Sequence, residues 1–234
     1  MKDYRTILLN IRESVRYKRW VAALIREYSS EVYNPFILDV GCGANKISKS
    51  KMVTGCDMFP VSDDIIQAAA DNLPYESGTI DMLVSAHCLE HMANPIKTIN
   101  EWCRAVGSDG VIWFILPHGS RTFDRPRPLT STDHVFDDFK HKTTEDDQTH
   151  YAEFRDLVIL SGHRVIPLEY IEKANKDDFE FFNNQRLIHH HVWTLRSFIE
   201  LLARLNLEIL YATDVVPGRR DSFSVIVRAN YNDL

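Results

Sequence analysis

The stretch Ile37-Leu38-Asp39-Val40-Gly41-Cys42-Gly43-Ala44-Asn45-Lys46 decides the fold of this chain. Its first four residues are typical of a buried strand, and they lead directly into two glycines separated by one residue. A parallel strand ends in this way when the turn after it must let backbone amides approach a ligand. The stretch therefore predicts a cofactor site at the carboxyl end of a parallel strand.

Composition and charge exclude several classes of protein. The 234 residues include 33 acidic and 27 basic side chains, which gives a formal net charge of −6 and argues against a surface for nucleic acid or anionic lipid. The longest apolar run, 111–116, is too short for a membrane span, and residues 1–20 lack the apolar centre of a signal peptide. The four cysteines show no Cys-x-x-Cys spacing and are typical of reduced thiols. We therefore expect a cytoplasmic protein.

The pattern along the chain predicts one α/β domain with a Rossmann-like, doubly wound, mostly parallel sheet. Buried strands are expected at 36–40, 53–56, 80–85 and 111–116. A helix over 95–106 connects the last two strands, opened by Asn94-Pro95 and closed by Gly107. Before the first strand, residues 4–29 are expected to form one or two amphipathic helices, with a buried stripe of Val21, Leu24, Ile25 and Tyr28.

A large insertion and a closing antiparallel hairpin are expected after the fourth strand. Residues 118–191 hold eight of the ten histidines and show no clean periodicity of useful length. Thr194 is expected to cap a helix, and 207–213 and 222–229 to form strands joined through Pro217-Gly218. The single domain then comprises an N-terminal helical segment 1–30, a cofactor-binding core 36–117, a lid and acceptor insertion 118–191, and a closing helix and hairpin 192–234.

The glycine turn alone fits either a dinucleotide or S-adenosylmethionine. Asp39, just before the glycines, would repel a pyrophosphate but would suit the amino group of a methionine moiety. The third glycine of a G-x-G-x-x-G pattern is missing, because Lys46 stands in its place. Asp57 follows the second strand about twenty positions later, where a carboxylate can accept hydrogen bonds from ribose hydroxyls. These features favour S-adenosylmethionine.

Two further blocks extend this pattern: Asp71-Asn72-Leu73-Pro74-Tyr75, and Ile80 to Val84 followed by Ser85-Ala86-His87-Cys88-Leu89-Glu90-His91. With the opening stretch, they resemble the class I S-adenosylmethionine-dependent methyltransferases (methyltransferase type 11-like) over residues 36–117. The resemblance implies a cofactor site made of Asp39, Gly41, Cys42, Gly43, Asp57, Met58, Ala70, Asp71, Asn72 and His87. In this site Asp57 would bind the ribose, Met58 would pack on adenine, and His87 would lie near the sulfonium. Ala69 stands where the family often has an aspartate, which predicts a weaker hold on adenine.

A second, narrower resemblance concerns the insertion. The segments 123–130 and 189–194, together with His134 and His150, look like those of methyltransferases associated with bacterial surface-polysaccharide biosynthesis. This resemblance implies a sugar, nucleotide-sugar or glycan hydroxyl as the methyl acceptor. An alcohol acceptor needs a base, for which the candidates are His118, His134 and His91. The predicted substrate-binding residues are Arg121, Asp124, Arg125, His150 and Trp193.

Several alternatives remain open. A lipid, quinone or other small-metabolite acceptor is one, and an apolar tunnel rather than a polar pocket would mark a lipid. A non-catalytic module that binds S-adenosylmethionine, as partner of a glycosyltransferase, is another, and a homo-oligomer is compatible with all of them. A metal held by His134, His150 and His189 or His191 with an aspartate is conceivable, but no spacing demands it. Adjacent residues of a strand point to opposite faces, so we expect no metal.

Overall fold

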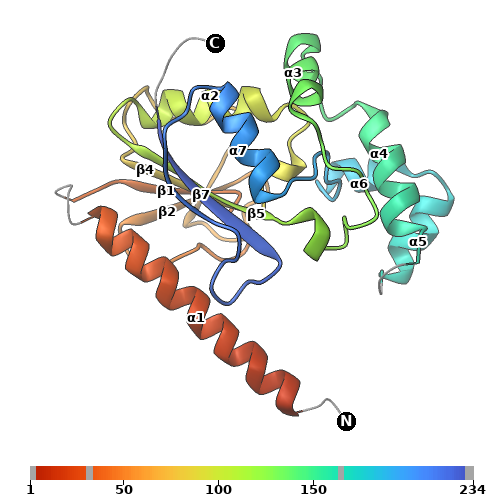
Figure 1. The fold of residues 1–234 in the computed structure, drawn as a ribbon, viewed down its shortest axis with the longest axis horizontal. Coiled ribbons are helices and arrows are strands. Elements are labelled where there is room, and N and C mark those ends of the chain that lie inside the picture. The colour runs from red at the N-terminus through yellow and green to blue at the C-terminus, as the bar shows by residue number, and fades with distance from the viewer. Residues whose placement is uncertain (1–3, 30–33, 163–165, 230–234) are drawn as a thin grey trace.

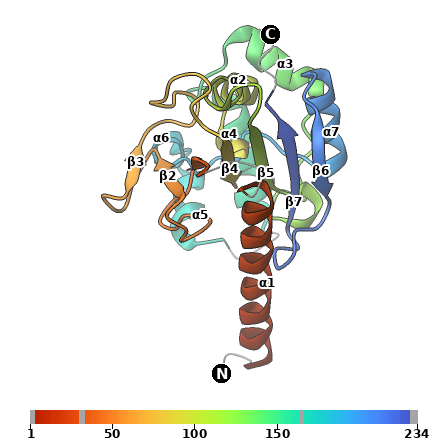
Figure 2. The same ribbon diagram turned by 90° about the vertical axis from the view of Figure 1, so that its left-hand side faces the viewer.

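The computed structural model of the chain describes residues 4–29, 34–162 and 166–229. Seven strands form one sheet in the order β3-β2-β1-β4-β5-β7-β6 (Figure 2). The first five run parallel: β1 (Ile37–Val40), β2 (Val53–Asp57), β3 (Ile65–Gln67), β4 (Met82–Ala86) and β5 (Val111–Pro117). β7 (Ser222–Arg228) is antiparallel to both β5 and β6 (Ile209–Thr213). The predicted Rossmann-like fold with a closing antiparallel hairpin is confirmed.

Helices cover both faces of the sheet, which explains why its central strands are apolar at successive positions. Neighbouring residues of β5 take opposite sides: Phe114 belongs to the cluster under α2 (Pro95–Val106) and α7 (Leu195–Arg204), and Trp113 to the cluster under α1 (Tyr4–Ser29). The rings of Trp113 and Trp20 of α1 meet edge to face at 5.2 Å. Figure 1 shows α1 on one side of the sheet and α2 and α7 on the other.

The predicted helix ends are confirmed where local capping chemistry sets them. α2 begins after Asn94, whose side chain accepts a hydrogen bond from the Lys97 amide at 3.0 Å, and it ends at Gly107 with φ +76°. α7 begins after Thr194, which forms a capping box with Ser197. In α1 the predicted apolar stripe lies against the sheet, because Val21 and Ile25 are buried there. Residues 4–29 form a single helix.

Two expectations about the fold were wrong. The short edge strand β3 was missed, so that β5, which precedes the insertion, is the fifth strand and not the fourth. The insertion is also more regular than expected, since it contains α3 (Thr132–His141), α4 (Gln148–Phe154), α5 (Leu168–Asn175) and α6 (Phe179–Asn184). These helices are too short for a recognisable period. Their caps were readable, because the side chains of Ser131, Asp147 and Asp178 each accept a bond from a first-turn amide.

The insertion has a small hydrophobic core of its own. Tyr151 and Phe154 of α4 pack there with Phe182 of α6 and with Ile188. This core lies apart from the two clusters of the sheet, and Figure 1 shows α3 to α6 gathered at one end of the molecule. The insertion therefore forms a separate layer beside the carboxyl ends of the parallel strands. Within the described ranges, no helix has the length and apolar character needed to cross a bilayer.

Candidate functional site

The turn after β1 requires glycine at its first position. Gly41 has φ +71°, and a Cβ atom built there would lie 2.5 Å from Cβ and 2.6 Å from Sγ of Cys88. The backbone of the turn therefore lies directly against the segment that follows β4. Gly43 has φ +56°, and no atom lies within 4 Å of a Cβ built there. Glycine is therefore favoured at this position by the backbone conformation alone and not by lack of space.

Asp57, at the end of β2, holds this turn in place. Its Oδ2 atom accepts a hydrogen bond from the Gly43 amide at 2.8 Å, and its Oδ1 atom accepts one from the Phe59 amide at 2.8 Å. A carboxylate has about four lone-pair sites, so these two bonds leave acceptor capacity for a ligand. The second predicted carboxylate, Asp39, is 2% exposed and lies beneath the turn, where its Oδ2 atom accepts from the Ile47 amide. Burial raises the pKa of Asp39 to about 7.

A pocket of about 230 Å³ opens beyond the carboxyl ends of β1, β2 and β4. It lies where ligands bind in open α/β sheets, outside the strand ends at the change in strand order. On the sheet side the predicted cofactor residues that line it are Gly41, Asp57, Met58, Ala70, Asp71 and His87. Ala69 lies among them. On the insertion side the lining residues are Glu145, Gln185 and Arg186.

The remaining predicted cofactor residues surround this pocket without lining it. Cys42 and Gly43 belong to the turn beside it, and Asn72 forms a bridge with Ala69. The loop predicted to contact adenine is held by a hydrogen bond from α2, because Nε1 of Trp102 donates to the carbonyl oxygen of Ala70 at 2.8 Å. Asp39 is likewise turned to the protein interior, so a contact between it and a methionine amino group stays a prediction.

His87 has its ring fixed by the closing hairpin. The Ser222 hydroxyl donates to Asp221 at 2.9 Å, so the 2.8 Å contact between this hydroxyl and Nε2 of His87 requires the imidazole to donate. The other nitrogen, Nδ1, then carries the lone pair and lies 3.6 Å from Oε1 of Glu90. Burial lowers the pKa of His87 to about 3, so the ring is neutral at neutral pH.

His91 has the opposite tautomer. Its Nδ1 atom lies 3.0 Å from the carbonyl oxygen of Ile188, which can only accept, so Nδ1 carries the proton. Nε2 is left with a lone pair, 4.0 Å from Oε1 of Glu90. Burial lowers the pKa of His91 to about 3, and the residue lines the pocket. Among the three predicted bases, His91 is the one that lines this pocket.

Glu90 is a candidate that sequence reasoning missed. Its side chain is fully buried, and within the described part of the chain neither carboxylate oxygen has a hydrogen-bond partner. Burial raises its pKa to about 7. The signal was present in the block His87 to His91, where one acidic residue stands between two histidines. Gln185 and Arg186 gave no such signal, because they follow α6, a helix of six residues that is too short to show a period.

The other predicted residues lie elsewhere. His118 directly follows β5, and its Nε2 atom is 3.5 Å from Asp214, which also pairs with Arg121 at 3.1 Å. Arg125 is exposed on the surface of the insertion. Trp193 is 2% exposed and packs between the rings of His191 and Phe198, so the structure gives it a packing role in place of the predicted sugar contact.

Asp124 binds its own chain in place of a substrate. It is 1% exposed, and its carboxylate contacts Arg127 at 3.0 Å and Nδ1 of His189 at 2.6 Å. Burial alone would raise its pKa, but the charges and hydrogen bonds of His189 and Arg127 hold the pKa below its ordinary value. The predicted base His134 and the predicted substrate residue His150 contact each other at 2.8 Å in a separate cluster within the insertion.

The comparisons with known proteins agree with this geometry. Residues 38–114 match the family model of the methyltransferase domain. No match to the chain was found among curated proteins. A solved S-adenosylmethionine-dependent methyltransferase from Thermotoga maritima is 9% identical, covers 97% of this chain and 94% of its own, and has a TM-score of 0.52. Another from Aquifex aeolicus is 10% identical, covers 88% of each chain and has a TM-score of 0.47. At 9% identity the likeness to the Thermotoga maritima structure shows the fold alone.

The residues of the pocket fit the cofactor. Gly41 lines the pocket with backbone alone, Asp57 offers carboxylate oxygens for hydroxyl donors, and Met58 offers an apolar surface to a nucleobase. The glycine at the start of the turn after β1, the family match and the fold are all consistent with a site for S-adenosylmethionine. Residues 38–114 form a methyltransferase domain with S-adenosylmethionine as its cofactor, and the protein is an S-adenosylmethionine-dependent methyltransferase.

Proposed function

We propose that this methyltransferase O-methylates a polar, sugar-like acceptor, with a sugar, nucleotide-sugar or glycan of surface-polysaccharide biosynthesis as the favoured class. The observation that carries the proposal is the insertion-side wall of the pocket. Glu145, Gln185 and Arg186 form this wall, and His87 and His91 line the same pocket. Carboxylate, amide and guanidinium groups offer directional hydrogen bonds to hydroxyls or to a phosphate, whereas a lipid acceptor would need an apolar lining.

Cofactor binding is assigned to the sheet side of the pocket. Asp57 would accept hydrogen bonds from the ribose, Met58 and Ala70 would contact adenine, and the backbone of Gly41 would approach the methionine end. Lys97 forms an ion pair with Asp71 at 2.7 Å, so Asp71 shapes the adenine edge while it is neutralised by its own chain. When bound, S-adenosylmethionine supplies an electrophilic methyl group on a sulfonium, and the protein must orient the acceptor and exclude water.

His91 is the proposed general base. The hydrogen bond to Ile188 fixes its tautomer, so Nε2 presents a lone pair to an acceptor hydroxyl in the pocket. The methyl group would pass to the acceptor oxygen with S-adenosylhomocysteine as the leaving group, and the hydroxyl proton would pass to Nε2 of His91, which becomes an imidazolium. Glu90, whose carboxylate lies 4.0 Å from Nε2, stabilises this cation when ionised. His87, held by Ser222, borders the same space and positions the acceptor.

An acceptor panel tests this proposal. The protein is incubated with S-adenosylmethionine and with nucleotide-sugars, methyl glycosides, quinols or dispersed lipids, and S-adenosylhomocysteine is measured. We expect turnover with a hydroxylated sugar derivative and none with lipids or quinols. Turnover confined to lipids or quinols would contradict the proposed acceptor class, while leaving the methyltransferase activity intact.

A further inference from the structure

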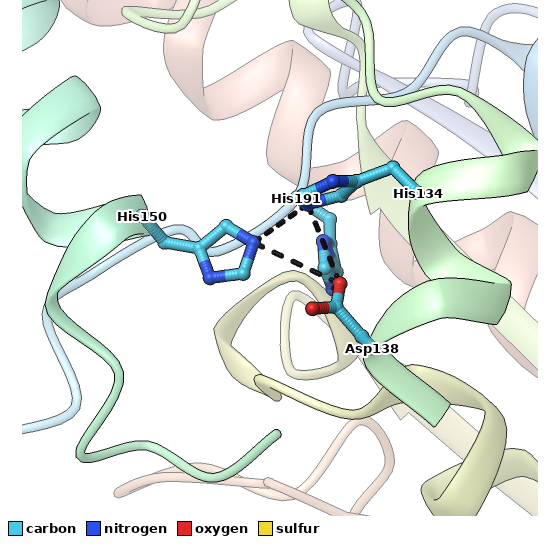
Figure 3. A group of neighbouring side chains, drawn as sticks. All are labelled: His134, Asp138, His150 and His191. Carbon is cyan, nitrogen blue, oxygen red and sulfur yellow. Dashed lines mark hydrogen bonds and ion pairs between the residues drawn. The ribbon is translucent and has the colours of Figure 1, made fainter. Parts of the chain in front are cut away.

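Four potential ligand atoms converge within the insertion, away from the cofactor pocket. His134 and Asp138 lie one turn apart on α3, His150 comes from α4, and His191 comes from the segment before α7 (Figure 3). One ligand atom of each lies within 4.8 Å of those of the other three. The distances are 2.8 Å between Nε2 of His134 and Nε2 of His150, and 3.4, 3.8 and 3.7 Å from Oδ2 of Asp138 to Nε2 of His134, His150 and His191.

Buried polar atoms of Asp138 and His191 in this cluster lack the hydrogen bonds that burial normally requires. Oδ2 of Asp138 and both ring nitrogens of His191 have no hydrogen-bond partner among the described residues, although His191 is 1% exposed. Buried polar atoms without partners destabilise a fold. A bound cation would satisfy the facing nitrogens and the carboxylate together.

We propose that His134, Asp138, His150 and His191 form a tetrahedral zinc site. Zinc–ligand bonds of about 2.0–2.1 Å in a tetrahedron separate the ligand atoms by about 3.3–3.4 Å. The four distances given above, from 2.8 to 3.8 Å, lie on both sides of this separation, and all the ligand atoms lie within 4.8 Å of one another. Three imidazoles and one carboxylate suit a borderline metal such as Zn²⁺ better than the all-oxygen shells of Mg²⁺ and Ca²⁺.

The surroundings provide a nearby carboxylate and an entry path. Nδ1 of His150 has no hydrogen-bond partner among the described residues, and a carboxylate oxygen of Asp147 lies 4.0 Å from it. A pocket of about 320 Å³ lined by His134 and His150 opens beside the cluster. The side chain of His134 is 48% exposed, so an ion can reach the site from solvent without unfolding of the insertion.

A site with four protein ligands is structural, because no position remains for a substrate. This one would join three segments that contact the core at other points. The carbonyl oxygen of Asp138 accepts from Nδ2 of Asn94, the residue that caps α2, at 3.2 Å. The amide of His190 donates to the carbonyl oxygen of Glu90 at 2.7 Å. Zinc at the cluster would therefore hold α3, α4 and the segment before α7 in one arrangement beside the cofactor pocket.

Metal binding can be measured on the full-length protein without any acceptor. Chelator-treated protein is titrated with zinc sulfate against a chromophoric chelator, and with cobalt chloride to follow the visible absorption of tetrahedral Co²⁺. We expect one zinc per chain and a tetrahedral cobalt spectrum. We also expect a higher midpoint of thermal unfolding and slower proteolysis within residues 118–191 when zinc is bound.

Paired variants assign the site. Asp138→Asn and His134→Ala should each lower the affinity for zinc at least tenfold. Asp137→Asn and His141→Ala change residues on the exposed side of the same helix, and they should leave this affinity unchanged. His134→Ala serves as the second test if Asp138→Asn does not fold, because His134 is half exposed. Glu90→Gln should also keep zinc, which separates this site from the neighbouring Glu90, His91 and His189 group.

The proposal is overturned if folded wild-type protein, confirmed by S-adenosylmethionine binding, takes up no zinc at micromolar concentration. It is also overturned if Glu90→Gln, and neither Asp138→Asn nor His134→Ala, removes the metal. The acceptor assay is independent of both outcomes, so a wrong acceptor class and an absent zinc site give different results.

Discussion

Nδ1 of His91 donates a hydrogen bond of 3.0 Å to the carbonyl oxygen of Ile188, and this contact joins the cofactor-binding core to the insertion. His91 belongs to the turn after β4, whereas Ile188 lies in the hydrophobic core of the insertion. The bond leaves a lone pair on Nε2 of a residue that lines the pocket. Any displacement of the segment around Ile188 would therefore change the orientation and tautomer of the proposed base.

His91→Asn separates this catalytic role from a structural one. The asparagine amide can still donate to the Ile188 carbonyl, but no group replaces Nε2. We expect kcat to fall by about 10²–10⁴-fold, the usual contribution of a general base, while the affinity for S-adenosylmethionine stays within a few-fold of wild type. Steady-state kinetics and calorimetry measure the two quantities. His141→Asn, exposed on α3, is the control, and an unchanged kcat for His91→Asn would exclude the base.

Gly41→Ala and Gly43→Ala distinguish a steric requirement from a conformational one. Both glycines have positive φ, but only at Gly41 would the added Cβ meet Cys88. We expect Gly43→Ala to cost about 1 kcal/mol of stability from the backbone term, and Gly41→Ala to cost about 2–4 kcal/mol because overpacking adds to it. Urea unfolding measures both. If both variants lost the same free energy of unfolding, Cys88 would be able to move away from the added Cβ of Gly41→Ala without cost.

Asp57→Asn should weaken cofactor binding. The asparagine side chain keeps one acceptor oxygen but loses the negative charge of the carboxylate. That charge strengthens the hydrogen bonds from the Gly43 and Phe59 backbone amides and would strengthen those from a ribose. A hydrogen bond to a charged group contributes about 1.5–3 kcal/mol, so we expect an affinity for S-adenosylmethionine about 10–100-fold lower by calorimetry. Asp63→Asn, on the exposed loop before β3, is the matched control. Wild-type affinity in Asp57→Asn would remove this carboxylate from the site.

Asp39 should make stability fall as the pH rises. Burial raises its pKa to about 7 from an ordinary value of 3.8, so the folded chain holds this proton more tightly than the unfolded chain does. Its contribution is fully present below pH 3.8 and is lost as the pH rises through 7. Asp39→Asn, which can still accept from Ile47, should remove this loss and gain up to about 4 kcal/mol over wild type at pH 8.

The pH profile is measured by urea unfolding between pH 4 and pH 8 without cofactor. Glu90, whose pKa is also raised by burial, contributes a slope of the same sign, and the difference between Asp39→Asn and wild type cancels it. Asp109→Asn, exposed after α2, should follow the wild-type profile. Parallel profiles for wild type and Asp39→Asn would contradict the raised pKa.

Arg127→Leu should destabilise the insertion strongly. The guanidinium is buried, where it pairs with Asp124 at 3.0 Å and donates to the carbonyl oxygen of His189 at 2.7 Å. Removing one partner of a buried ion pair leaves the other charge uncompensated, which costs about 3–5 kcal/mol. Arg196→Leu removes an exposed pair with Glu200 and should change stability by less than about 0.5 kcal/mol. Urea unfolding compares them, and similar losses would refute a stabilising role for the buried pair.

The sequence by itself determined the elements whose signals are local. The strand and glycine turn at 37–46 are set by apolar burial and by positive φ at Gly41. The ends of α2 and α7 are set by side chains that cap their own first turns, Asn94 and Thr194. Periodicity placed the buried stripe of α1, because a helix longer than five turns shows its period clearly. The cofactor class followed from the same short segments.

Only the tertiary structure decided which distant side chains meet. β3 is an edge strand of three residues, too short to show an alternation of apolar and polar residues. The helices of the insertion are likewise too short for a clear helical periodicity in the sequence. Contacts such as Asp124 with His189 depend on how these short elements pack on one another. The same packing brings His134, Asp138, His150 and His191 together, although their spacing in the sequence shows no metal-binding pattern. The glycine turn therefore could be predicted from residues 37–46, whereas the polar wall and the histidine cluster required the folded insertion.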